Sequence, residues 1–342
     1  TIHLTMDTAN SYTLYSFMLL MLLMGTVNMV MLKFQHMQAV PMIPGGPAVP
    51  FDHPWFQAGL MMVGEFLCLP VYFCTRRPSD VKSSERTPKW IFLVPCCCDL
   101  IATALVCTGL AFVAVSVVQM CRGSIIIFAC AMSFLFLGRR QHNYQLVGVV
   151  LVTVGISLVS MSALQAQSKG TSSNLFLGIS LCIIAQVFQA SMFVYEEKIM
   201  TQYVVEPLQV VGMEGLCGII ISGVLLTVFH FLGYANTPGA IYQICHSPPL
   251  LFSVFGSMLA VAAFNFSGAT VTKKSSAVAR TTIKISSTIL IWFVELAAGW
   301  NTFSRLQLFG FMFVAVGTFV YNRIVVVPLL EPPLEAAALA KA

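Results

Sequence analysis

The sequence has little charge for its length. Its 342 residues include 18 Lys and Arg and 13 Asp and Glu, which together make 9% of the chain. A soluble domain carries about 25% charged residues. So few ionisable side chains cannot cover the surface of a water-soluble protein of this size. Because 58% of the residues are hydrophobic, we expect lipid to be the main solvent and the fold to be an all-α integral membrane fold.

The sequence also lacks the motifs of several function classes. It has no P-loop, no glycine-rich dinucleotide fingerprint and no Ser-His-Asp context, so neither an ATP-driven pump nor a membrane hydrolase is supported. The 11 cysteines lie mostly in apolar runs, and Cys96, Cys97 and Cys98 lack the CxxC spacing of a zinc site. No basic face carries interleaved aromatic residues. We therefore expect no enzyme activity, no cofactor, no metal and no nucleic-acid partner.

Ten apolar stretches have the length of a membrane-spanning helix, which needs about 20 residues to cross about 30 Å of hydrocarbon. The ten predicted helices are Tyr12 to Lys33, Pro54 to Arg76, Lys89 to Phe112, Val115 to Gly138, Tyr144 to Ala163, Asn174 to Lys198, Pro207 to Leu232, Pro249 to Thr270, Ser275 to Gly299 and Arg305 to Val327.

Basic residues between these stretches predict the orientation, because Lys and Arg in short loops stay in the cytosol. The odd-numbered loops hold only Lys33, Lys169 and Arg305. The even-numbered loops and the C-terminal tail hold Arg76, Arg77, Lys82, Arg86, Lys89, Arg139, Arg140, Lys198, Lys273, Lys274, Arg323 and Lys341. Both termini are therefore predicted to be cytosolic, and the helix count is predicted to be even.

A polar segment at the middle of the chain, Gln167 to Ser173, predicts a boundary between two five-helix repeats. The repeats would span residues 12–166 and 172–327, followed by a cytosolic tail at 328–342. An odd number of helices in each repeat inserts the two with opposite orientation. Aligning the sequence with itself at an offset of 161 positions supports the division. This shift pairs Gly138 with Gly299 and Ser116 to Gln119 with Ala277 to Arg280.

Three cations lie inside predicted helices rather than in loops. At a rise of about 1.5 Å per residue, Arg122 lies ~10 Å below the start of its helix and Lys284 ~14 Å below the start of its own. Arg280 shares the helix of Lys284. A charge at such a depth costs about 2.5 to 3.5 kcal/mol on insertion scales, so these side chains are expected to face the bundle interior or a wet cavity.

Their spacing predicts a binding face. Arg280 and Lys284 are four residues apart and share one helix face, and Gln119 and Arg122 are three residues apart and share another. Under the shift, Gln119 overlies Arg280 and Gly123 overlies Lys284, which makes the two faces symmetry mates. Gly123 would admit a close approach by a ligand or a helix. Asn265 adds an amide from the eighth helix.

Acidic residues in the membrane leave two readings open. Asp99, Glu65 and Glu214 lie in the third, second and seventh predicted helices. In one reading the cations pair with such acids and tie helices together. In the other, the cations line a central cavity that binds an anionic or polar solute, while an acid such as Glu65 or Glu214 exchanges protons. The two readings are compatible.

Several strings, in order along both halves, resemble the drug/metabolite transporter superfamily, and within it the nucleotide-sugar-transporter-like F group of solute carrier family thirty-five. The resemblance covers about Tyr12 to Asn322. The strings are Phe51 to Ala58, Val63 to Cys68, Gln119 to Phe128, Phe136 to Arg140, Glu196 to Lys198, Val211 to Gly215, Phe264 to Gly268 and Val271 to Lys273.

The resemblance implies a ten-helix inverted-repeat fold, a central cavity and alternating access, but it supplies no solute. The positions that match the family are Glu65, Gln119, Arg122, Gly123, Glu196, Glu197, Glu214, Asn265 and Arg280. The chain departs from close relatives at Lys284, where they carry an acid, and at Ser287, where they carry a base.

Taken together, these observations predict a secondary-active transporter of a polar or anionic small molecule, such as a nucleotide sugar, a nucleotide or an amino-acid-like solute. Relatives point to an endomembrane of the lysosome or Golgi kind, with the mitochondrial membrane as an alternative. A non-transporting accessory subunit of a larger membrane complex is the other reading, because lipid and a partner helix demand the same apolar surface. A homodimer or another membrane-protein partner is left open.

Overall fold

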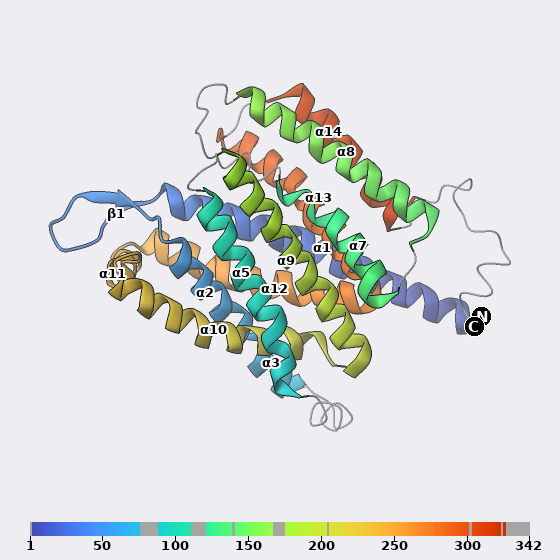
Figure 1. Cartoon of the computed structure of the whole chain (residues 1–342), viewed down its shortest axis with the longest axis horizontal. Helices are drawn as coiled ribbons and strands as arrows, with labels where there is room; N and C mark the ends of the chain where they lie inside the picture. The colour runs from blue at the N-terminus through green and yellow to red at the C-terminus, as the bar shows by residue number, and fades with distance from the viewer. Residues whose placement is uncertain are drawn as a thin grey trace. The chain divides into compact units, whose positions relative to one another are not determined.

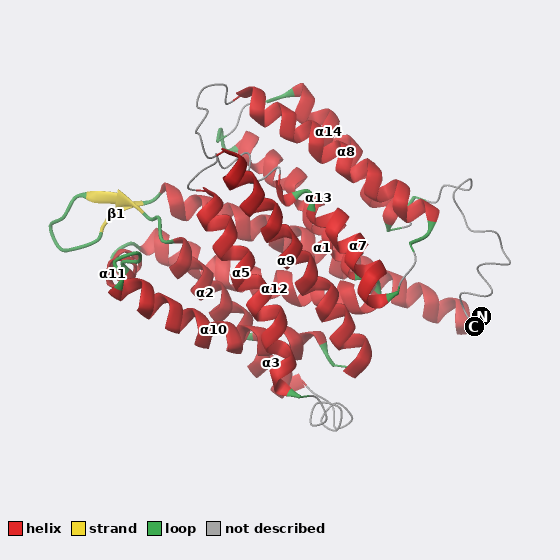
Figure 2. Ribbon diagram, viewed as in Figure 1, coloured by secondary structure: helices red, strands yellow, loops and turns green. Residues whose placement is uncertain are grey.

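The chain folds into apolar α-helices, with one short hairpin (Figure 1; Figure 2). The computed structural model describes residues 2–75, 88–110, 121–138, 141–166, 175–203, 205–300, 303–322 and 324–325. In the first part of the chain these are α1 (Ile2–Met37), β1 (Ala39–Pro41), β2 (Ala48–Pro50), α2 (Pro54–Phe66), α3 (Cys68–Thr75), the 3₁₀ helix η1 (Lys89–Phe92), α5 (Leu93–Leu110), α7 (Ile125–Leu137) and α8 (Asn143–Ala166).

The remaining elements are all helical. They are α9 (Leu175–Tyr203), α10 (Pro207–Phe231), α11 (Thr237–Cys245), α12 (Pro248–Lys274), α13 (Ala277–Ala297) and α14 (Arg305–Tyr321). In the described parts of the chain, seven helical spans are long and apolar enough to cross a membrane, and α7, α14 and the first part of α8 are shorter apolar helices. The chain is thus an all-α, multi-pass membrane protein. Each predicted segment contains a described helix, while the count of ten crossings stays a prediction.

Contacts between helices divide the chain into two compact units that do not follow its sequence halves. The first unit contains Thr1–Thr103 and Tyr195–Ser275, and the second contains Ala104–Val194 and Ser276–Ala342. Each unit therefore combines helices from the first and the second half of the chain. The predicted boundary at 167–173, the tail at 328–342 and the basic loop residues Arg76 to Arg86, Arg139, Arg140 and Arg323 lie outside the described residues.

In the first unit, α1 packs along α12, and α2 packs against both α10 and α12. At one end, a hairpin and α11 cover these helices. The hairpin pairs β1 with β2 in antiparallel register, Val40 opposite Val49, and its turn holds Gly45 at φ 74°. Phe51, Ala240 and Leu250 are fully buried in the cluster beneath it. The sequence predicted a loop here, and neither the hairpin nor α11 was expected.

In the second unit, α8 and α14 lie side by side along their lengths (Figure 1), and α13 packs against α7 and α14. Glycines bring the backbones of α8 and α14 together. A Cβ on Gly155 would lie 2.5 Å from the carbonyl oxygen of Gly310, and one on Gly310 would lie 2.6 Å from that of Gly155. Gly148 and Gly317 repeat this reciprocal contact at 2.9 and 2.8 Å. Small residues allow such close packing where lipid provides no hydrophobic drive.

Two of the predicted continuous helices are interrupted. The second stops at Leu67 between α2 and α3, because Pro70 has no N–H to donate to the carbonyl of Phe66. The fourth turns at Gly123 and Ser124 before α7 begins. There the Ser124 hydroxyl donates a hydrogen bond to the Cys121 carbonyl at 2.7 Å. Hydropathy detects the apolar run and does not register such local breaks.

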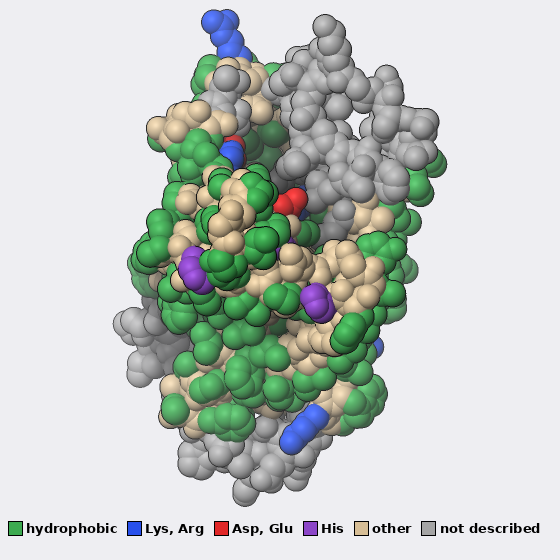
Figure 3. All heavy atoms as spheres, turned by 90° about the vertical axis from the view of Figure 1, so that its left-hand side faces the viewer, with side chains coloured by type: hydrophobic (Ala, Val, Ile, Leu, Met, Phe, Trp, Pro, Cys, Tyr) green, Lys and Arg blue, Asp and Glu red, His purple; other side chains and the backbone are tan. Residues whose placement is uncertain are grey.

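The surface is that of a protein surrounded by lipid. Large hydrophobic side chains are exposed along most helices, among them Phe134 and Leu135 on α7 and Phe252 on α12. Figure 3 shows hydrophobic side chains over much of one face, with few charged ones between them. Water would not tolerate so many exposed apolar groups, whereas hydrocarbon does.

Candidate substrate-binding site

Arg280 and Lys284 form the best-defined part of the predicted site. Ser276 caps the start of α13 by accepting a hydrogen bond from the Ala279 amide at 3.1 Å, and this fixes the helix just ahead of the two cations. Arg280 is only 1% exposed, and Lys284 is half-buried. Both contact the ring of Phe193 on α9: the Arg280 Cζ lies 4.1 Å and the Lys284 Nζ 5.0 Å from its centroid. The predicted shared face is therefore present.

Hydroxyl groups on the other side of α13 fix the orientation of this helix about its own axis. Ser286 and Thr318 of α14 are hydrogen-bonded at 2.7 Å. The Asn322 amide, just after α14, donates to the Thr282 hydroxyl at 3.1 Å. Thr282 and Ser286 follow the helical spacing of one face, and Arg280 and Lys284 that of another. The polar contact with α14 thus directs the cations toward α9.

Arg122 lies near a different stretch of α9. It is half-buried and lies close enough to Cys182 to act electrostatically on its thiol. Cys182 precedes Phe193 by three turns, which is ~16 Å along an α-helix. Gly123 is buried, and a Cβ there would lie 2.1 Å from the Ile156 side chain. Gly123 therefore lets this segment pack closely against Ile156 of α8. Gln119 lies outside the described residues.

The predicted coupling acids lie in the first unit. Glu65 on α2 is 5% exposed and accepts a hydrogen bond of 2.5 Å from the Asn265 amide on α12. Asn265, predicted to bind substrate, is thus hydrogen-bonded to Glu65, a predicted coupling acid. Glu214 on α10 is 4% exposed, and Glu214 and Asp99 both act electrostatically on Cys96.

The helices that carry the two glutamates touch where those residues lie. A Cβ on Gly215 would lie 2.3 Å from the Phe66 amide nitrogen and 2.9 Å from the Glu65 Cβ. The glycine after Glu214 is therefore what allows α10 to approach α2 at Glu65. Glu65 and Glu214 are therefore both buried where these two helices meet.

Three buried side chains near the end of α9 were not proposed as binding or coupling residues. Phe193 is 2% exposed, Glu196 is fully buried and Glu197 is 5% exposed. The glutamates had a sequence signal, because the string Glu196 to Lys198 matches the family. Phe193 had none, since it is one of 26 phenylalanines in an apolar chain.

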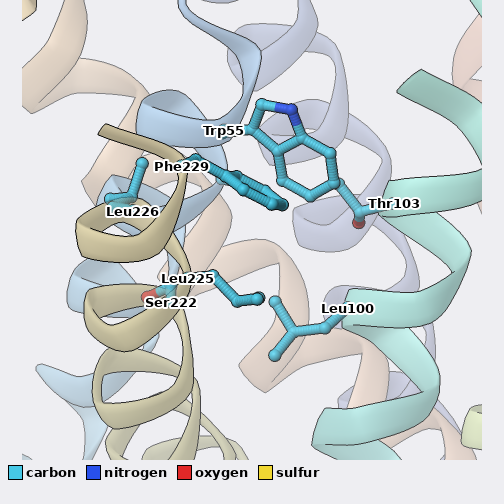
Figure 4. Close-up of a pocket in the computed structure, with 8 residues that line it drawn as sticks. Trp55, Leu100, Thr103, Ser222, Leu225, Leu226 and Phe229 are labelled. Atoms are coloured by element: carbon cyan, nitrogen blue, oxygen red, sulfur yellow. The ribbon is translucent and has the colours of Figure 1, made fainter. Parts of the chain in front are cut away.

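Two pockets lie in the first unit and contain none of the predicted site residues. One lies between α2, α5 and α10, where the Trp55 and Phe229 rings meet edge to face at 5.0 Å beside Leu100 and Leu225 (Figure 4). The other is a groove between the end of α10 and α11, bordered by His230 and His246. Within the described residues, no group of three or more His, Cys, Asp or Glu is placed to hold a metal ion.

Comparisons with known proteins now identify the family. The family described as Solute carrier family 35 (SLC35F) matches residues 48–323. This chain belongs to solute carrier family 35. It is 33% identical over 322 residues to Solute carrier family 35 member F6 of Homo sapiens and of Rattus norvegicus, a match that covers 89% of this chain and 87% of each relative. An uncharacterized protein of Schizosaccharomyces pombe is 30% identical, covering 92% of this chain and 98% of that protein.

A solved crystal structure shares the fold of this solute carrier. It aligns with a TM-score of 0.69 and 11% sequence identity, over 92% of this chain and 97% of that chain. At this identity the likeness concerns the fold alone. Family membership confirms the resemblance found in the sequence and a solute-carrier role in a membrane. It favours a transporter over both the accessory subunit and an enzyme.

Proposed function

We propose that this member of solute carrier family 35 is a secondary-active transporter that moves a polar or anionic small molecule across an organelle membrane by alternating access. The solute class is that of nucleotide sugars, nucleotides or amino-acid-like molecules. The observation that carries the proposal is the pair of cations on one face of α13, Arg280 and Lys284, which both lie against the Phe193 ring inside an apolar helix bundle. Such charges are costly in lipid and mark a solute pathway.

The proposed fold has ten membrane helices in two inverted five-helix repeats, residues 12–166 and 172–327. The contact between α8 and α14 supports it. A shift of 162 positions carries Gly148 onto Gly310 and Gly155 onto Gly317, and each glycine contacts the mate of the other. Gly148 contacts Gly317, and their counterparts in the other repeat, Gly310 and Gly155, contact each other. A two-fold axis between the two helices produces such a reciprocal pair of contacts.

The ends of the fourth and ninth helices agree with such a repeat. Gly138 follows α7 at φ 63°, and Gly299 lies just beyond α13 at φ 70°. These two glycines were paired by the shift of 161. Both adopt the left-handed conformation that ends a helix, so the two segments stop in the same way.

In the proposed mechanism, Glu65 and Glu214 couple solute movement to protons, with Asp99 beside them. Arg280 and Lys284 bind the solute, and Arg122, Gly123 and Gln119 belong to the symmetry-related face. Both termini, with the tail at 328–342, are placed in the cytosol. The membrane is of the lysosomal or Golgi kind, or alternatively mitochondrial. A homodimer or another membrane-protein partner is compatible with the exposed apolar helices.

The experiment measures uptake into reconstituted vesicles of wild type, Arg280→Gln and Lys284→Gln. The solute is first found by a thermal-shift screen of the purified protein against nucleotides, nucleotide sugars, amino acids and small peptides. Each variant should lower uptake roughly 10- to 100-fold, the equivalent of one lost hydrogen bond to a charged group.

Arg305→Gln is the matched control, because Arg305 lies exposed at the start of α14 and should leave uptake unchanged. Membrane insertion of all three variants is compared by protease protection. If both α13 variants insert normally and transport like wild type, the binding face is wrong.

A further inference from the structure

Phe193 covers the two cations of the proposed site. Its ring centroid lies 4.1 Å from the guanidinium carbon of Arg280 and 5.0 Å from the ammonium nitrogen of Lys284. Phe193 itself is 2% exposed and Arg280 is 1% exposed. In this conformation, therefore, a solute cannot reach the guanidinium. Phe193, one of the side chains that bury it, belongs to α9, a helix that carries no residue of the predicted face.

The contact with the ring is favourable but weaker than the contact an anion would make. The face of an aromatic ring is electron-rich and attracts a cation. An anion pairs with Arg through two parallel charge-assisted hydrogen bonds, which are stronger and directional. The ring thus stabilises Arg280 and Lys284 while no solute is bound, and yields to a ligand with negative charge.

We propose that Phe193 is a specificity-determining side chain that occupies the cation face of Arg280 and Lys284 and must move aside for a compact dianion of the phosphate type. This inference rests on the proposed function, since it assumes that the two cations bind the solute. A dianion is favoured because both cations contact the same ring, so a group that replaces the ring lies within reach of both side chains. A singly charged carboxylate would neutralise only one of them.

The ring should set a threshold for binding. Any anion that enters must overcome the cation–π contacts, which correspond to a factor of about 5 to 30 in affinity. A polyoxygen dianion gains enough from two cations to do so, and weak anions do not. Phe193 would thereby exclude abundant small monoanions from the site.

Two substitutions of Phe193 change the attraction of its side chain for cations in opposite directions. Phe193→Leu keeps an apolar side chain and removes the aromatic face, so inorganic phosphate should bind roughly 3- to 10-fold more tightly. Phe193→Trp enlarges the face that attracts cations best, so binding should weaken by a similar factor.

The measurement is isothermal titration of the purified full chain in lipid nanodiscs with inorganic phosphate, uridine 5′-monophosphate and acetate. Comparison of the first two separates free phosphate from a nucleotide phosphate, and acetate is the monoanion. Phe309→Leu on α14 is the matched control, because Phe309 is 58% exposed and should leave affinity unchanged. Labelling of Lys284 by an amine reagent, followed by mass spectrometry, gives a second readout that needs no ligand.

Labelling of Lys284 should be faster in Phe193→Leu than in wild type and slower again when phosphate is added. Equal affinities and equal labelling in wild type, Phe193→Leu and Phe193→Trp would overturn the role of Phe193. If Arg280→Gln and Lys284→Gln still lose uptake in that case, the proposed function stands and only this inference fails. The proposed preference for a dianion would be overturned by either of two results with wild type. In one, acetate binds as tightly as phosphate or the nucleotide; in the other, neither phosphate nor the nucleotide binds.

Discussion

The two compact units bury charge of opposite sign. Among the described residues, the charged side chains with the least exposure in the first unit are all acidic: Glu65, Glu196, Glu197 and Glu214. In the second unit the corresponding residue is a base, Arg280. Charges inside a membrane protein persist where they serve a pathway or a relay. The difference agrees with the proposed roles, in which the first unit exchanges protons and the second binds the anion.

Hydrogen bonds and close glycine contacts both join helices within the two units. In the first, buried amides connect helices: Gln57 donates to Gln35 at 2.9 Å, and Gln35 donates to the Ser257 hydroxyl of α12 at 3.1 Å. At the end covered by the hairpin, Gln243 of α11 donates to the carbonyls of Val40 and Val49. In the second unit, α8 and α14 meet through glycines. Each unit also contains the other kind of contact: Gly215 brings α10 against α2 in the first, and Ser286 and Thr318 join α13 to α14 in the second.

The largest expected effect comes from filling the glycine contact of the second unit. Gly155→Ala places a Cβ 2.5 Å from the Gly310 carbonyl oxygen, and because a backbone atom is in the way the helices must separate. Overpacking of this kind costs typically 1 to 3 kcal/mol, and we expect about 3 kcal/mol here. Thermal unfolding of the purified protein in detergent measures it.

Gly223→Ala on α10 is the control for this change, because no atom lies within 4 Å of the Cβ position there. The helical position should gain slightly from alanine, by about 0.5 to 1 kcal/mol. Equal melting temperatures for the two variants would show that close packing does not hold α8 to α14.

A smaller effect is expected from the amide that joins Glu65 to α12. Asn265→Ala removes the donor of the 2.5 Å hydrogen bond and leaves a buried carboxyl group without it, which costs about 1 to 3 kcal/mol. Ser267→Ala, two residues further along α12, removes a hydroxyl bonded to the Ala263 carbonyl of its own helix. It should change the melting temperature much less.

The same pair of variants tests whether the first unit exchanges protons while the second binds the anion. If the first unit exchanges protons, Asn265→Ala should alter the pH dependence of uptake and leave phosphate affinity at Arg280 and Lys284 unchanged. A loss of phosphate affinity with an unchanged pH profile would contradict the assignment of the two roles.

Sequence reasoning found the helices and the shared face of Arg280 and Lys284, because apolar length and a spacing of four residues are local properties. It missed the breaks at Leu67 and Gly123, which depend on single backbone hydrogen bonds, and it missed α11, which is too short to span a membrane. Phe193 could not be found, since its role comes from a contact with a helix nearly 90 positions further along the chain. Asn265 was assigned to substrate, while its hydrogen bond is with Glu65.

The smallest expected effect tests whether the paired segments of the two repeats are equivalent. Gly138→Ala and Gly299→Ala introduce no clash, because nothing lies within 4 Å of either Cβ position. Both residues have φ near the left-handed minimum, at 63° and 70°, where alanine costs about 1 kcal/mol. The two variants should therefore lower the melting temperature by the same few degrees, whereas Gly223→Ala raises it. A large effect at one glycine and none at the other would mean that the fourth and ninth helices end for different reasons, and the repeat would lose this support.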